Sequence, residues 1–411
     1  MVTYPSDWKT YSFVKFFRLI PNNTLSRDKL TTSGSIGNIH YGDVLIKYGD
    51  MISDQDSIPR VRENIGFVAN NLLQKNDVII ADTAEDETVG KVTQVGDVSI
   101  PLVGGLHTVV CRPNVETADG YLGCYMNSRY YHDQLLPYIT GIKVSSVSKK
   151  SLNETELTIP STVDEQQEII KVFHKMDQHI NNLSMLIEKK KGIRDGALED
   201  LVTGKTRIRG FCSERKEYLI NDITRAVITG GTPSTARQEY YGGDIPWISS
   251  TEIHQKRITK PTAYITEMGL QNSSAKIAPE KSVLIALAGQ GKTRGTAAYL
   301  TKPMALNQSL AALVTNEKCN SEFLYYLIES MYSSLRELSS GDGGRGGLNK
   351  KLIKGVLVTI PVDVGEQEAI ANTLTAMDEE IRDLETERDK IIQIREGAMD
   401  DLLTGRVRLT K

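Results

Sequence analysis

Two stretches of this sequence are copies of one another, and they decide the fold. Residues 159–208 read IPSTVDEQQEIIKVFHKMDQHINNLSMLIEKKKGIRDGALEDLVTGKTRI, and residues 360–409 read IPVDVGEQEAIANTLTAMDEEIRDLETERDKIIQIREGAMDDLLTGRVRL. They align without a gap at an offset of about 201 residues, with about 20 identities in about 50 positions. Unrelated segments do not reach this level by chance, so the chain contains an internal duplication.

Each copy predicts one long helix. Apolar residues recur at alternating spacings of four and three, beginning with Ile169, Phe173 and Met176 in the first copy. This 3.5-residue repeat is typical of helices that pack side by side. Pro160 and Pro361 stand just upstream of the predicted helix starts, and Gly204 or Gly405 stands where a left-handed C-terminal cap is expected. A helix of roughly 40 residues is about 60 Å long.

Charged side chains interrupt the apolar stripe. They occupy four seam positions: Lys190, Arg194, Arg388 and Arg395. In one interpretation, the long stems snorkel or specify the register of the helix pair. In the other, the seam ends there and the arginines contact a partner protein. We take Arg194, Arg395, Leu201 and Leu402 as candidates for that contact.

Composition places the chain among globular proteins. It has 411 residues, of which 39% are hydrophobic and 25% charged. No stretch approaches the roughly 18 apolar residues of a membrane span, and the N-terminus lacks the features of a signal peptide. The four cysteines show neither a disulfide framework nor metal-ligand spacing. We therefore expect a cytoplasmic protein with no membrane contact and no metal site.

The net charge of −3 hides an uneven distribution. Residues 210–360 carry about +5, whereas residues 361–411 carry about −6 and residues 1–158 about −3. A protein that binds DNA needs local cationic surface rather than a basic chain. The charge distribution therefore permits DNA binding without requiring it.

The segments around the copies predict two globular α+β domains of similar length and little shared sequence. Strand-like runs such as residues 77–81 and 282–286 are bounded by turn-forming residues, and helix-like stretches cover residues 120–138 and 321–338. The predicted α+β domains are residues 1–158 and 210–359, and the predicted long-helix segments are residues 159–209 and 360–411. The predicted architecture alternates two α+β domains with two long helices that pair as an antiparallel coiled coil with pseudo-two-fold symmetry.

One motif points toward an enzyme. Residues 286–293, ALAGQGKT, fit a relaxed phosphate-loop pattern after a predicted strand. A phosphate loop requires a following helix whose N-terminal amides bind the phosphates. Residues 294–300 predict a strand instead, so we do not expect nucleotide hydrolysis. The six histidines are dispersed and form no metal-ligand or catalytic motif.

The chain resembles the specificity subunits of type I restriction-modification systems over essentially its whole length. The resemblance rests on the duplicated Ile-Pro, Glu-Gln, Met-Asp, Arg-x-Gly-Ala and Thr-Gly blocks. It also rests on residues 230–234, GGTPS, and residues 240–248, YYGGDIPWI. Residues 39–44, IHYGDV, resemble a second version of that last element.

The resemblance implies a non-catalytic, DNA-binding role. Each α+β domain would be a target recognition domain that reads one half of a split site in double-stranded DNA. The helices would set the spacing between the halves and bind two methyltransferase subunits, and motor-nuclease subunits would join for restriction. S-adenosylmethionine, ATP and magnesium would be held by those partners, and this chain would need no cofactor. It has no Asn-Pro-Pro-Tyr tetrapeptide of its own.

Polar and basic loop residues are the candidates for DNA contact, because such side chains reach base edges and phosphates. They are His40, Tyr41, Lys143, Ser145 and Ser146 in the first domain, and Thr232, Lys292, Thr293, Arg294 and Arg345 in the second. The alternative function is a structural scaffold whose two domains bind other proteins, which exposed apolar patches would favour.

Overall fold

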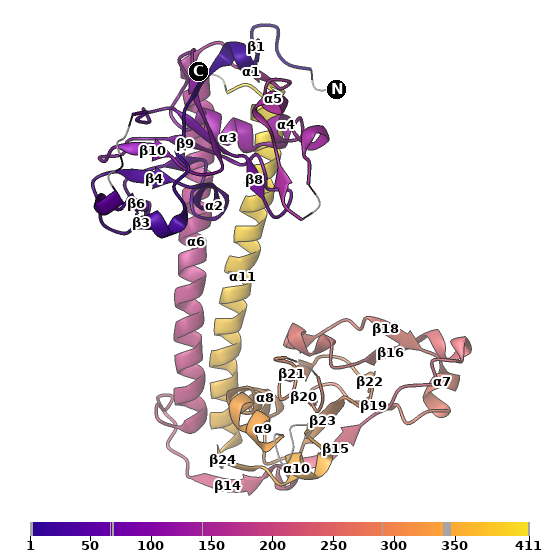
Figure 1. Ribbon diagram of the computed structural model, residues 1–411. Coiled ribbons are helices and arrows are strands. Elements are labelled where there is room, and N and C mark those ends of the chain that lie inside the picture. Colours follow the sequence, from indigo (N-terminus) through magenta and orange to yellow (C-terminus); the bar gives the residue numbers. More distant parts are fainter. Residues whose placement is uncertain are drawn as a thin grey trace. The chain divides into compact units, whose positions relative to one another are not determined.

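The computed structural model describes residues 3–65, 67, 70–141, 143–289, 291–339 and 347–409. The chain forms two compact units, Met1–Leu183 with Glu387–Lys411, and Ser184–Thr386, here named unit 1 and unit 2. Each unit contains an α+β head and parts of both long helices. The first head precedes the first long helix, and the second head lies between the two long helices in the sequence (Figure 1).

The first head is built on two sheets. A five-stranded sheet has the order β2-β11-β7-β9-β5, and a four-stranded sheet has the order β10-β4-β6-β3. The strands of the first sheet are β2 Phe17–Ile20, β5 Met51–Ile52, β7 Val78–Ala81, β9 Val92–Val95 and β11 Thr108–Pro113. Those of the second are β3 Leu30–Thr31, β4 Gly37–Ile39, β6 Arg60–Val61 and β10 Leu102–Gly104. Strands β7 and β9 are buried at every position, as expected of strands covered on both faces.

Short helices and two further strand pairs complete the first head. The helices are α1 Phe13–Phe16, η1 Arg27–Lys29, α2 Tyr41–Ile46, η2 Glu63–Ile65, α3 Tyr121–Asn127, α4 Arg129–His132, η3 Leu136–Tyr138 and α5 Lys149–Leu152. The strand pairs are β1 Lys9–Ser12 with β13 Glu156–Ile159, and β8 Thr83–Ala84 with β12 Ser145–Ser146. The first pair joins the beginning of the head to the strand that leads into the long helix.

The second head has a five-stranded sheet of the same topology and a four-stranded sheet that differs in one edge strand. Its five-stranded sheet has the order β15-β23-β20-β21-β17, and its four-stranded sheet the order β18-β16-β22-β19. The strands are β15 Thr224–Thr229, β17 Arg257–Ile258, β20 Val283–Ala286, β21 Ala297–Leu300, β23 Leu310–Thr315, β16 Tyr241–Ile248, β18 Ala263–Ile265, β19 Lys276–Ala278 and β22 Met304–Leu306. Strands β14 Arg215–Leu219 and β24 Leu357–Pro361 pair in front of the second long helix.

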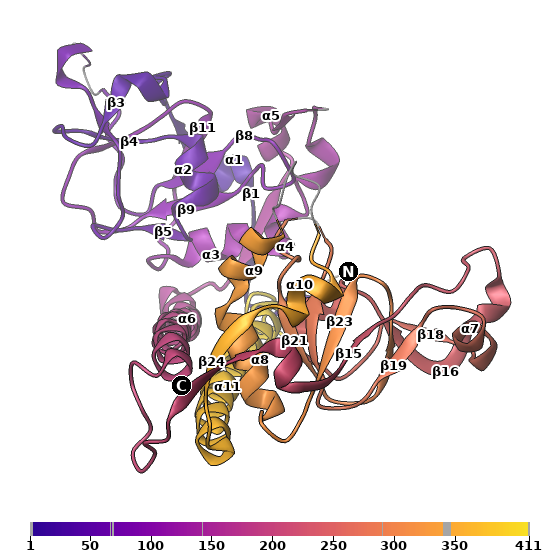
Figure 2. The same ribbon diagram turned by 90° about the horizontal axis from the view of Figure 1, so that it is seen from below.

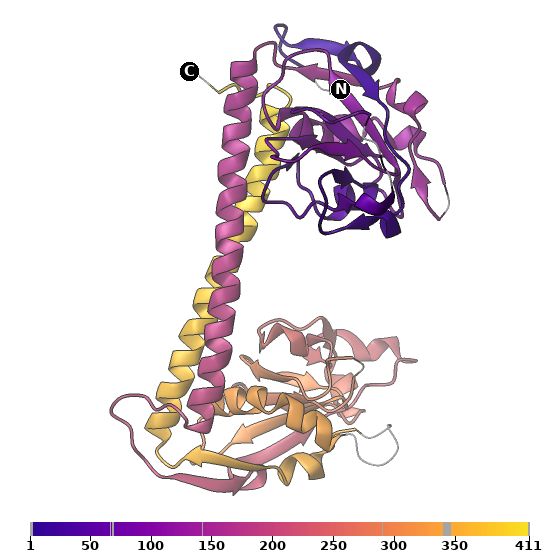
Figure 3. The same cartoon turned by 60° about the vertical axis from the view of Figure 1, so that its left-hand side comes forward.

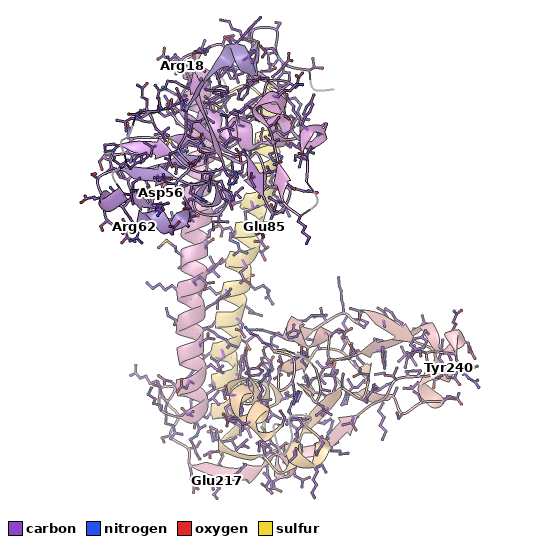
Figure 4. The ribbon with its side chains drawn as sticks, viewed as in Figure 1. Arg18, Asp56, Arg62, Glu85, Glu217 and Tyr240 are labelled. Carbon is purple, nitrogen blue, oxygen red and sulfur yellow. The ribbon has the colours of Figure 1, made fainter. Side chains whose placement is uncertain are left out.

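Helices cover the second head as they cover the first. They are η4 Ile220–Asp222, η5 Gln238–Tyr240, η6 Glu252–Gln255, α7 Glu267–Gln271, α8 Ser321–Ser330, α9 Tyr332–Leu338 and α10 Lys350–Lys354. Strands β16, β18 and β19 with α7 form the part of this head that is remote from the long helix α11 Val364–Leu402 (Figure 2). Tyr240 lies at that remote end (Figure 4). The strands and helical stretches predicted for both heads are thus present. The five-stranded sheets share a topology that the sequences do not reveal, whereas β3 and β19 lie at opposite edges of the two four-stranded sheets.

The long helices are α6 Val163–Thr203 and α11. Within each unit, the beginning of one lies beside the end of the other in antiparallel orientation (Figures 1 and 3). In unit 1 Arg395 pairs with Asp177, and in unit 2 Arg194 pairs with Asp378. Gly204 and Gly405 have φ values of +81° and +69°, so the predicted left-handed caps are confirmed. Among the described residues, no helix combines the length and apolar composition that crossing a bilayer requires.

The duplicated Glu-Gln motif joins each head to the helix pair. Gln166 accepts a hydrogen bond from the Ala118 amide at 2.9 Å, and Gln367 accepts one from the Asn320 amide at 2.8 Å. Each preceding glutamate pairs with an arginine beyond the end of the other helix. Arg408 donates to Glu165 at 2.8 Å, and Arg207 donates to Glu366 at 2.7 Å. The duplication therefore preserves a set of contacts that occurs once in each unit.

Burial and hydrogen-bond donors shift the pKa of Glu366 in opposite directions. Glu366 is only 1% exposed. Burial alone would raise the pKa of its carboxyl, but hydrogen bonds from Arg207 and Ser213 hold the pKa below its usual value. The carboxylate therefore stays charged and paired, as a buried acidic group must.

Candidate nucleic-acid interface

The turn of residues 230–234 in the second head is held by the neighbouring motif of residues 240–248. Trp247 Nε1 donates to the carbonyl oxygen of Gly231 at 3.2 Å, and the Tyr241 hydroxyl donates to that of Pro233 at 2.6 Å. A Cβ on Gly230 would lie 1.8 Å from the carbonyl oxygen of Leu306. Only glycine fits so close an approach of two backbones. The two motifs on which the resemblance rests are therefore two parts of one local structure.

Thr232 lies exposed on this turn. Its hydroxyl donates to Gln308 Oε1 at 2.7 Å, which connects the turn to the segment that follows β22. Ser309, next in that segment, accepts from the Ser250 amide at 3.1 Å and from Leu287 through its carbonyl oxygen at 2.8 Å. Three loops of the second head therefore meet around residues 308 and 309.

The first head contains an equivalent turn that the sequence analysis missed. The Asn23 amide donates to Gly104 at 2.9 Å, as the Gly231 amide donates to Leu306 at 3.0 Å. Gly104 pairs with Ile39 and Leu306 with Ile248 in corresponding parallel strand pairs. Residues 22–26, NNTLS, thus correspond to residues 230–234, GGTPS. The shared threonine and serine are the only signal of this correspondence.

The predicted equivalence of residues 39–44 with residues 240–248 is wrong. Ile39 corresponds to Ile248, at the end of the motif, so the Tyr-Gly-Asp residues of the first head follow the strand instead of lying in it. They begin α2, whereas those of the second head lie in η5 and β16. The same three residue types occur in two different backbone structures.

His40, a predicted DNA contact, is the N-cap of α2. Its Nδ1 accepts from the Gly42 amide at 3.3 Å, and the side chain is largely buried, with 7% of the residue exposed. Burial and the nearby Arg27 guanidinium lower the pKa of His40, so the ring is neutral and serves as an acceptor. Ser249 has the same place in the second head, where its hydroxyl accepts from the Thr251 amide at 3.2 Å. This placement supports a local structural role for His40.

Of the other candidates in the first head, Tyr41 and Ser146 lie near His107. The Tyr41 ring contacts the His107 ring edge-on, with centroids 5.3 Å apart, and Thr83 lies 3.3 Å from His107 Nδ1. Thr83 pairs with Ser146 through β8 and β12, and Ser145 is the next residue of β12. A cavity of about 310 Å³ opens between these elements. Lys143 is exposed on the adjoining segment.

Three candidates of the second head lie on the loop between β20 and β21. Thr293 Oγ1 lies 3.1 Å from His254 Nε2, and Arg294 donates to the Ser339 hydroxyl at 3.3 Å. Lys292 is exposed, and no carboxylate among the described residues lies within ion-pair distance of its ammonium. Arg345 lies outside the described residues. The loop leads into strand β21, which confirms the prediction that no phosphate-binding helix follows it.

The equivalent loop of the first head has the opposite charge. Both loops close with the same bonds, from the Ala81 amide to Lys91 at 2.9 Å and from the Ala286 amide to Thr296 at 3.0 Å. The loop of residues 82–91 carries Asp82, Glu85, Asp86, Glu87 and Lys91, whereas that of residues 287–296 carries Lys292 and Arg294. Glu85 lies at the periphery of the first head (Figure 4). The two heads therefore present different chemistry at the same place.

The four candidates for partner contact lie inside the units. The Arg194 side chain is 5% exposed, with Nε 2.8 Å from Asp378 and the guanidinium over the Tyr326 ring. Arg395 pairs with Asp177 and lies over the Phe173 ring. Leu201 and Leu402 belong to the buried cores of unit 2 and unit 1. This burial gives no support to direct partner contact, and it favours the interpretation in which the arginines specify the helix register.

Comparison with known proteins places the chain in a family. The profile described as "Type I restriction modification DNA specificity domain" matches residues 5–189 and again residues 213–394. Over 425 aligned positions, the chain is 22% identical to a protein named as the MjaX specificity subunit of a type I restriction enzyme from Methanocaldococcus jannaschii. The alignment covers 98% of this chain and 95% of that protein. It is also 28% identical to the EcoR124I/EcoR124II specificity subunit from Escherichia coli over 152 residues, or 36% of this chain and 37% of that one.

Solved structures share the fold. The S subunit of a type I restriction-modification system from M. genitalium matches with a TM-score of 0.60 at 16% identity, covering 98% of this chain and 97% of that one. A chain from a study of complex assembly in the type I restriction-modification system matches with a TM-score of 0.63 at 14% identity, covering 99% of this chain and all of that one. Because the DNA specificity domain matches twice and covers most of its length, this chain belongs to the family of type I restriction-modification specificity subunits.

Proposed function

We propose that each head reads one half of a split sequence in double-stranded DNA, and that the long helices set the number of unread base pairs between the halves. The observation that carries this proposal is the pair of heads whose five-stranded sheets share one topology and whose equivalent loops differ in chemistry. A scaffold that binds two identical ligands would need no such difference. Two different half-sites require it, because base identity is read by the donors and acceptors that a loop presents.

The two loops favour different bases. Lys292 and Arg294 supply donors, which suit the O6 and N7 acceptors of guanine and the phosphates. Glu85 and Glu87 supply only acceptors, which suit the amino group of cytosine, and they repel phosphates. The second head is therefore the stronger candidate for backbone contact, and the first head depends more on base edges and on other surfaces.

In this proposal, partner subunits carry out the methylation and cleavage reactions. Two methyltransferase subunits bind the helices and carry S-adenosylmethionine, and motor-nuclease subunits carry ATP and magnesium. This chain contributes recognition and geometry, and it acts in the cytoplasm, where the DNA is. Among the described residues, no cluster of three or more His, Cys, Asp or Glu side chains is arranged to hold a metal ion.

Adenine methylation across a genome tests the proposal. A host free of methylation would express this chain with its candidate modification subunit, and the control would omit this chain alone. We expect a split methylated motif only when the chain is present. Replacing residues 210–358 with the corresponding domain of a relative should change one half of the motif and leave the other half and the spacing unchanged.

A negative result has a defined meaning in this experiment. If the complex assembles and the methyltransferase is active on other DNA, yet no motif appears, the chain does not direct sequence recognition. That outcome would favour the alternative function, a scaffold whose heads bind other proteins.

A further inference from the structure

His107 in the first head has a strained backbone. Its φ is +54°, in the left-handed region that few residues other than glycine adopt. Surrounding hydrogen bonds fix the turn that carries it. Asn22 Nδ2 donates to the carbonyl oxygens of Gly105 at 2.9 Å and Thr108 at 2.8 Å, and the Thr108 hydroxyl donates to Gly105 at 2.7 Å. Strain of this kind persists only where the surrounding structure imposes it, and it is concentrated at functional sites.

The contacts of the His107 ring determine which nitrogen carries the proton. Nδ1 lies 3.4 Å from Asp82 Oδ1 and 3.3 Å from Thr83 Oγ1. The carboxylate can only accept, and the Thr83 hydroxyl already donates its proton to Asp82 Oδ1 at 2.8 Å. Both neighbours of Nδ1 are therefore acceptors, so Nδ1 carries the proton of the neutral ring and Nε2 is an acceptor. Among the described residues, none is within hydrogen-bond reach of Nε2.

His107 and Asp82 line a cavity at the surface of the first head. Its volume is about 310 Å³, and most of the other lining residues carry hydroxyl groups: Thr83, Tyr138, Thr140, Ser146, Ser148 and Ser151. The side chains of His107 and Asp82 are 48% and 28% exposed, so a ligand can reach both. The Tyr41 ring packs edge-on against the imidazole and orients it. The cavity therefore combines two acceptors, an imidazole nitrogen and a carboxylate, on one preorganised turn.

The second head lacks this pair of acceptors. The Asp82 amide donates to the His107 carbonyl oxygen at 3.1 Å, and in the second head the Leu287 amide donates to that of Ser309 at 2.8 Å. Leu287, in the place of the carboxylate, is apolar and buried. The Ser309 hydroxyl, in the place of the imidazole, donates to Asn307 Oδ1 at 2.6 Å. The backbone is thus shared and the acceptor pair is not, as expected of a determinant of one half-site.

Free acceptors select ligands that donate hydrogen bonds. In the major groove of B-DNA the base donors are the amino groups of adenine and cytosine, whereas guanine and thymine have carbonyl oxygens. Each base pair has one such amino group, and its place depends on which strand carries the adenine or cytosine. An acceptor held at a fixed place therefore distinguishes A·T from T·A and C·G from G·C.

We propose that His107 and Asp82 form a base-reading site that accepts a hydrogen bond from the amino group of one adenine or cytosine. The inference rests on the proposed function, and it specifies the class of base at one position of the first half-site. His107 is then a specificity-determining residue, and Thr83 and Tyr41 are positioning residues that set the tautomer and the orientation of its ring.

Removing the imidazole tests the site without weakening the fold. Glycine adopts a φ of +54° without strain, so His107→Gly should not lower the midpoint of thermal unfolding. The matched control is His174→Ala, which removes an exposed imidazole of α6 outside this cavity. Each variant would be assembled with the candidate modification subunit, and genome-wide adenine methylation would be measured. The first half-site is the half that stays unchanged when residues 210–358 are exchanged.

The methylated motif should change at one position. The wild-type chain and His174→Ala should give the same motif. With His107→Gly, one adenine or cytosine of the first half-site should be replaceable by other bases, with the second half and the spacing unchanged. The preference at that position should fall about tenfold, the effect of losing one base contact.

A base analogue identifies the contact itself. Duplexes would carry at that position either the natural base or a base of the same shape without the amino group, and fluorescence anisotropy would measure binding by the assembled complex. The wild-type complex should bind the altered duplex about tenfold more weakly. The double variant His107→Gly/Asp82→Ala should bind both duplexes equally, because neither acceptor remains. A purely structural role of His107 would not make binding insensitive to one amino group.

Two results would overturn the inference and leave the proposed function intact. One is an unchanged motif for the double variant. The other is an equal loss of affinity for the altered duplex in the wild-type complex and in the double variant, which would assign recognition of the amino group to other residues. Absence of any motif with the wild-type chain, in a complex that assembles and is active on other DNA, would remove the proposed function and this site with it.

Discussion

Arg194 shows how a residue that looks misplaced in the sequence is used. It interrupts an apolar stripe, yet its guanidinium contacts Asp378 and Glu329 and lies over the Tyr326 ring. Its side chain is 5% exposed, and the two carboxylate side chains are 22% and 21% exposed. Removing the arginine leaves two carboxylates that are poorly hydrated and close to one another. Removing one member of a buried ion-pair group destabilises the fold by more free energy than the complete group contributes to stability.

We therefore expect Arg194→Leu to lower the free energy of unfolding of unit 2 by about 2 kcal/mol, below the range for fully buried pairs because the carboxylates are partly hydrated. Urea unfolding measured by circular dichroism would detect the loss. The control is Arg382→Leu on α11. The Arg382 side chain is 62% exposed, and its one ion pair within the described part of the chain is with Glu379. That change should stay within about 0.5 kcal/mol. Equal losses in the two variants would show that the Arg194 contacts do not stabilise the unit.

The sequence could identify Arg194 and Arg395 as unusual but could not identify their partners. Spacing along one helix places a residue on a face, whereas its contacts depend on the antiparallel register of a second helix. That register follows from paired ions, Arg194 with Asp378 and Arg395 with Asp177, and each member of a pair is the repeat counterpart of a member of the other. For the same reason, the sequence could not show that Leu201 and Leu402, the other candidates for partner contact, are buried.

At the level of elements, the loop between the third and fourth strands of the large sheet distinguishes the heads. Its closing hydrogen bonds are the same in both, and Gly90 and Gly295 have positive φ values of 90° and 85°. The net charge of this loop is negative in the first head and positive in the second. A backbone that is kept while the charge changes is what recognition of two different ligands requires. Only the charges were visible in the sequence, because the correspondence of the loops depends on the topology of the heads.

Reversing one charge tests whether this loop contacts the phosphates of the DNA backbone. Lys292→Glu should weaken DNA binding by the assembled complex to a similar degree for all sequences and should reduce the slope of log K against log salt by about 1. Glu87→Lys, at the equivalent position of the first head, should raise the slope by a similar amount. Fluorescence anisotropy with a target duplex at several salt concentrations would measure both.

The control for the loop is an exposed lysine elsewhere on the second head. Lys302→Ala removes a cationic side chain from the turn between β21 and β22 and should leave the slope unchanged. A slope that does not respond to Lys292→Glu would place the loop away from the DNA backbone. In that case neither this loop nor the equivalent acidic loop of the first head would contact phosphate.

The topology of the heads was beyond the reach of sequence patterns. The turn of residues 22–26 and that of residues 230–234 share only a threonine and a serine, and they are held in different ways. Asn22 and Asn23 add side-chain bonds to Gly105 and Gly104 in the first turn, whereas in the second turn Gly230 leaves room for the close approach of the Leu306 carbonyl oxygen. Different residues can satisfy one backbone path, so residue identity alone led to the wrong match for residues 39–44.

At the scale of the whole molecule, each unit needs a helix end from the distant copy of the repeat. The core of unit 1 includes Leu402, the last residue of α11, and the following Leu403, together with Ile169, Ile170 and Phe173 from α6. The repeat counterparts of the first two are Leu201 and Val202, which have the same place in unit 2. A chain that ends after the first repeat therefore retains a substitute for the part of unit 1 that it has lost.

We accordingly expect residues 1–209, expressed alone, to form a homodimer in which the end of each α6 packs on the head and the α6 beginning of the other copy. Leu201 would replace Leu402, and Arg194 would pair with Asp177 of the second copy as Arg395 does in the full chain. Sedimentation equilibrium should give twice the mass of the fragment. Asp177→Arg should produce monomers, because the new arginine would lie opposite Arg194 of the other copy and repel it. Combining Asp177→Arg with Arg194→Asp should restore the dimer, because the ion pair forms again with its charges exchanged. A monomeric, folded wild-type fragment would contradict the expectation, because the first head would then be stable without the helix end that the repeat supplies.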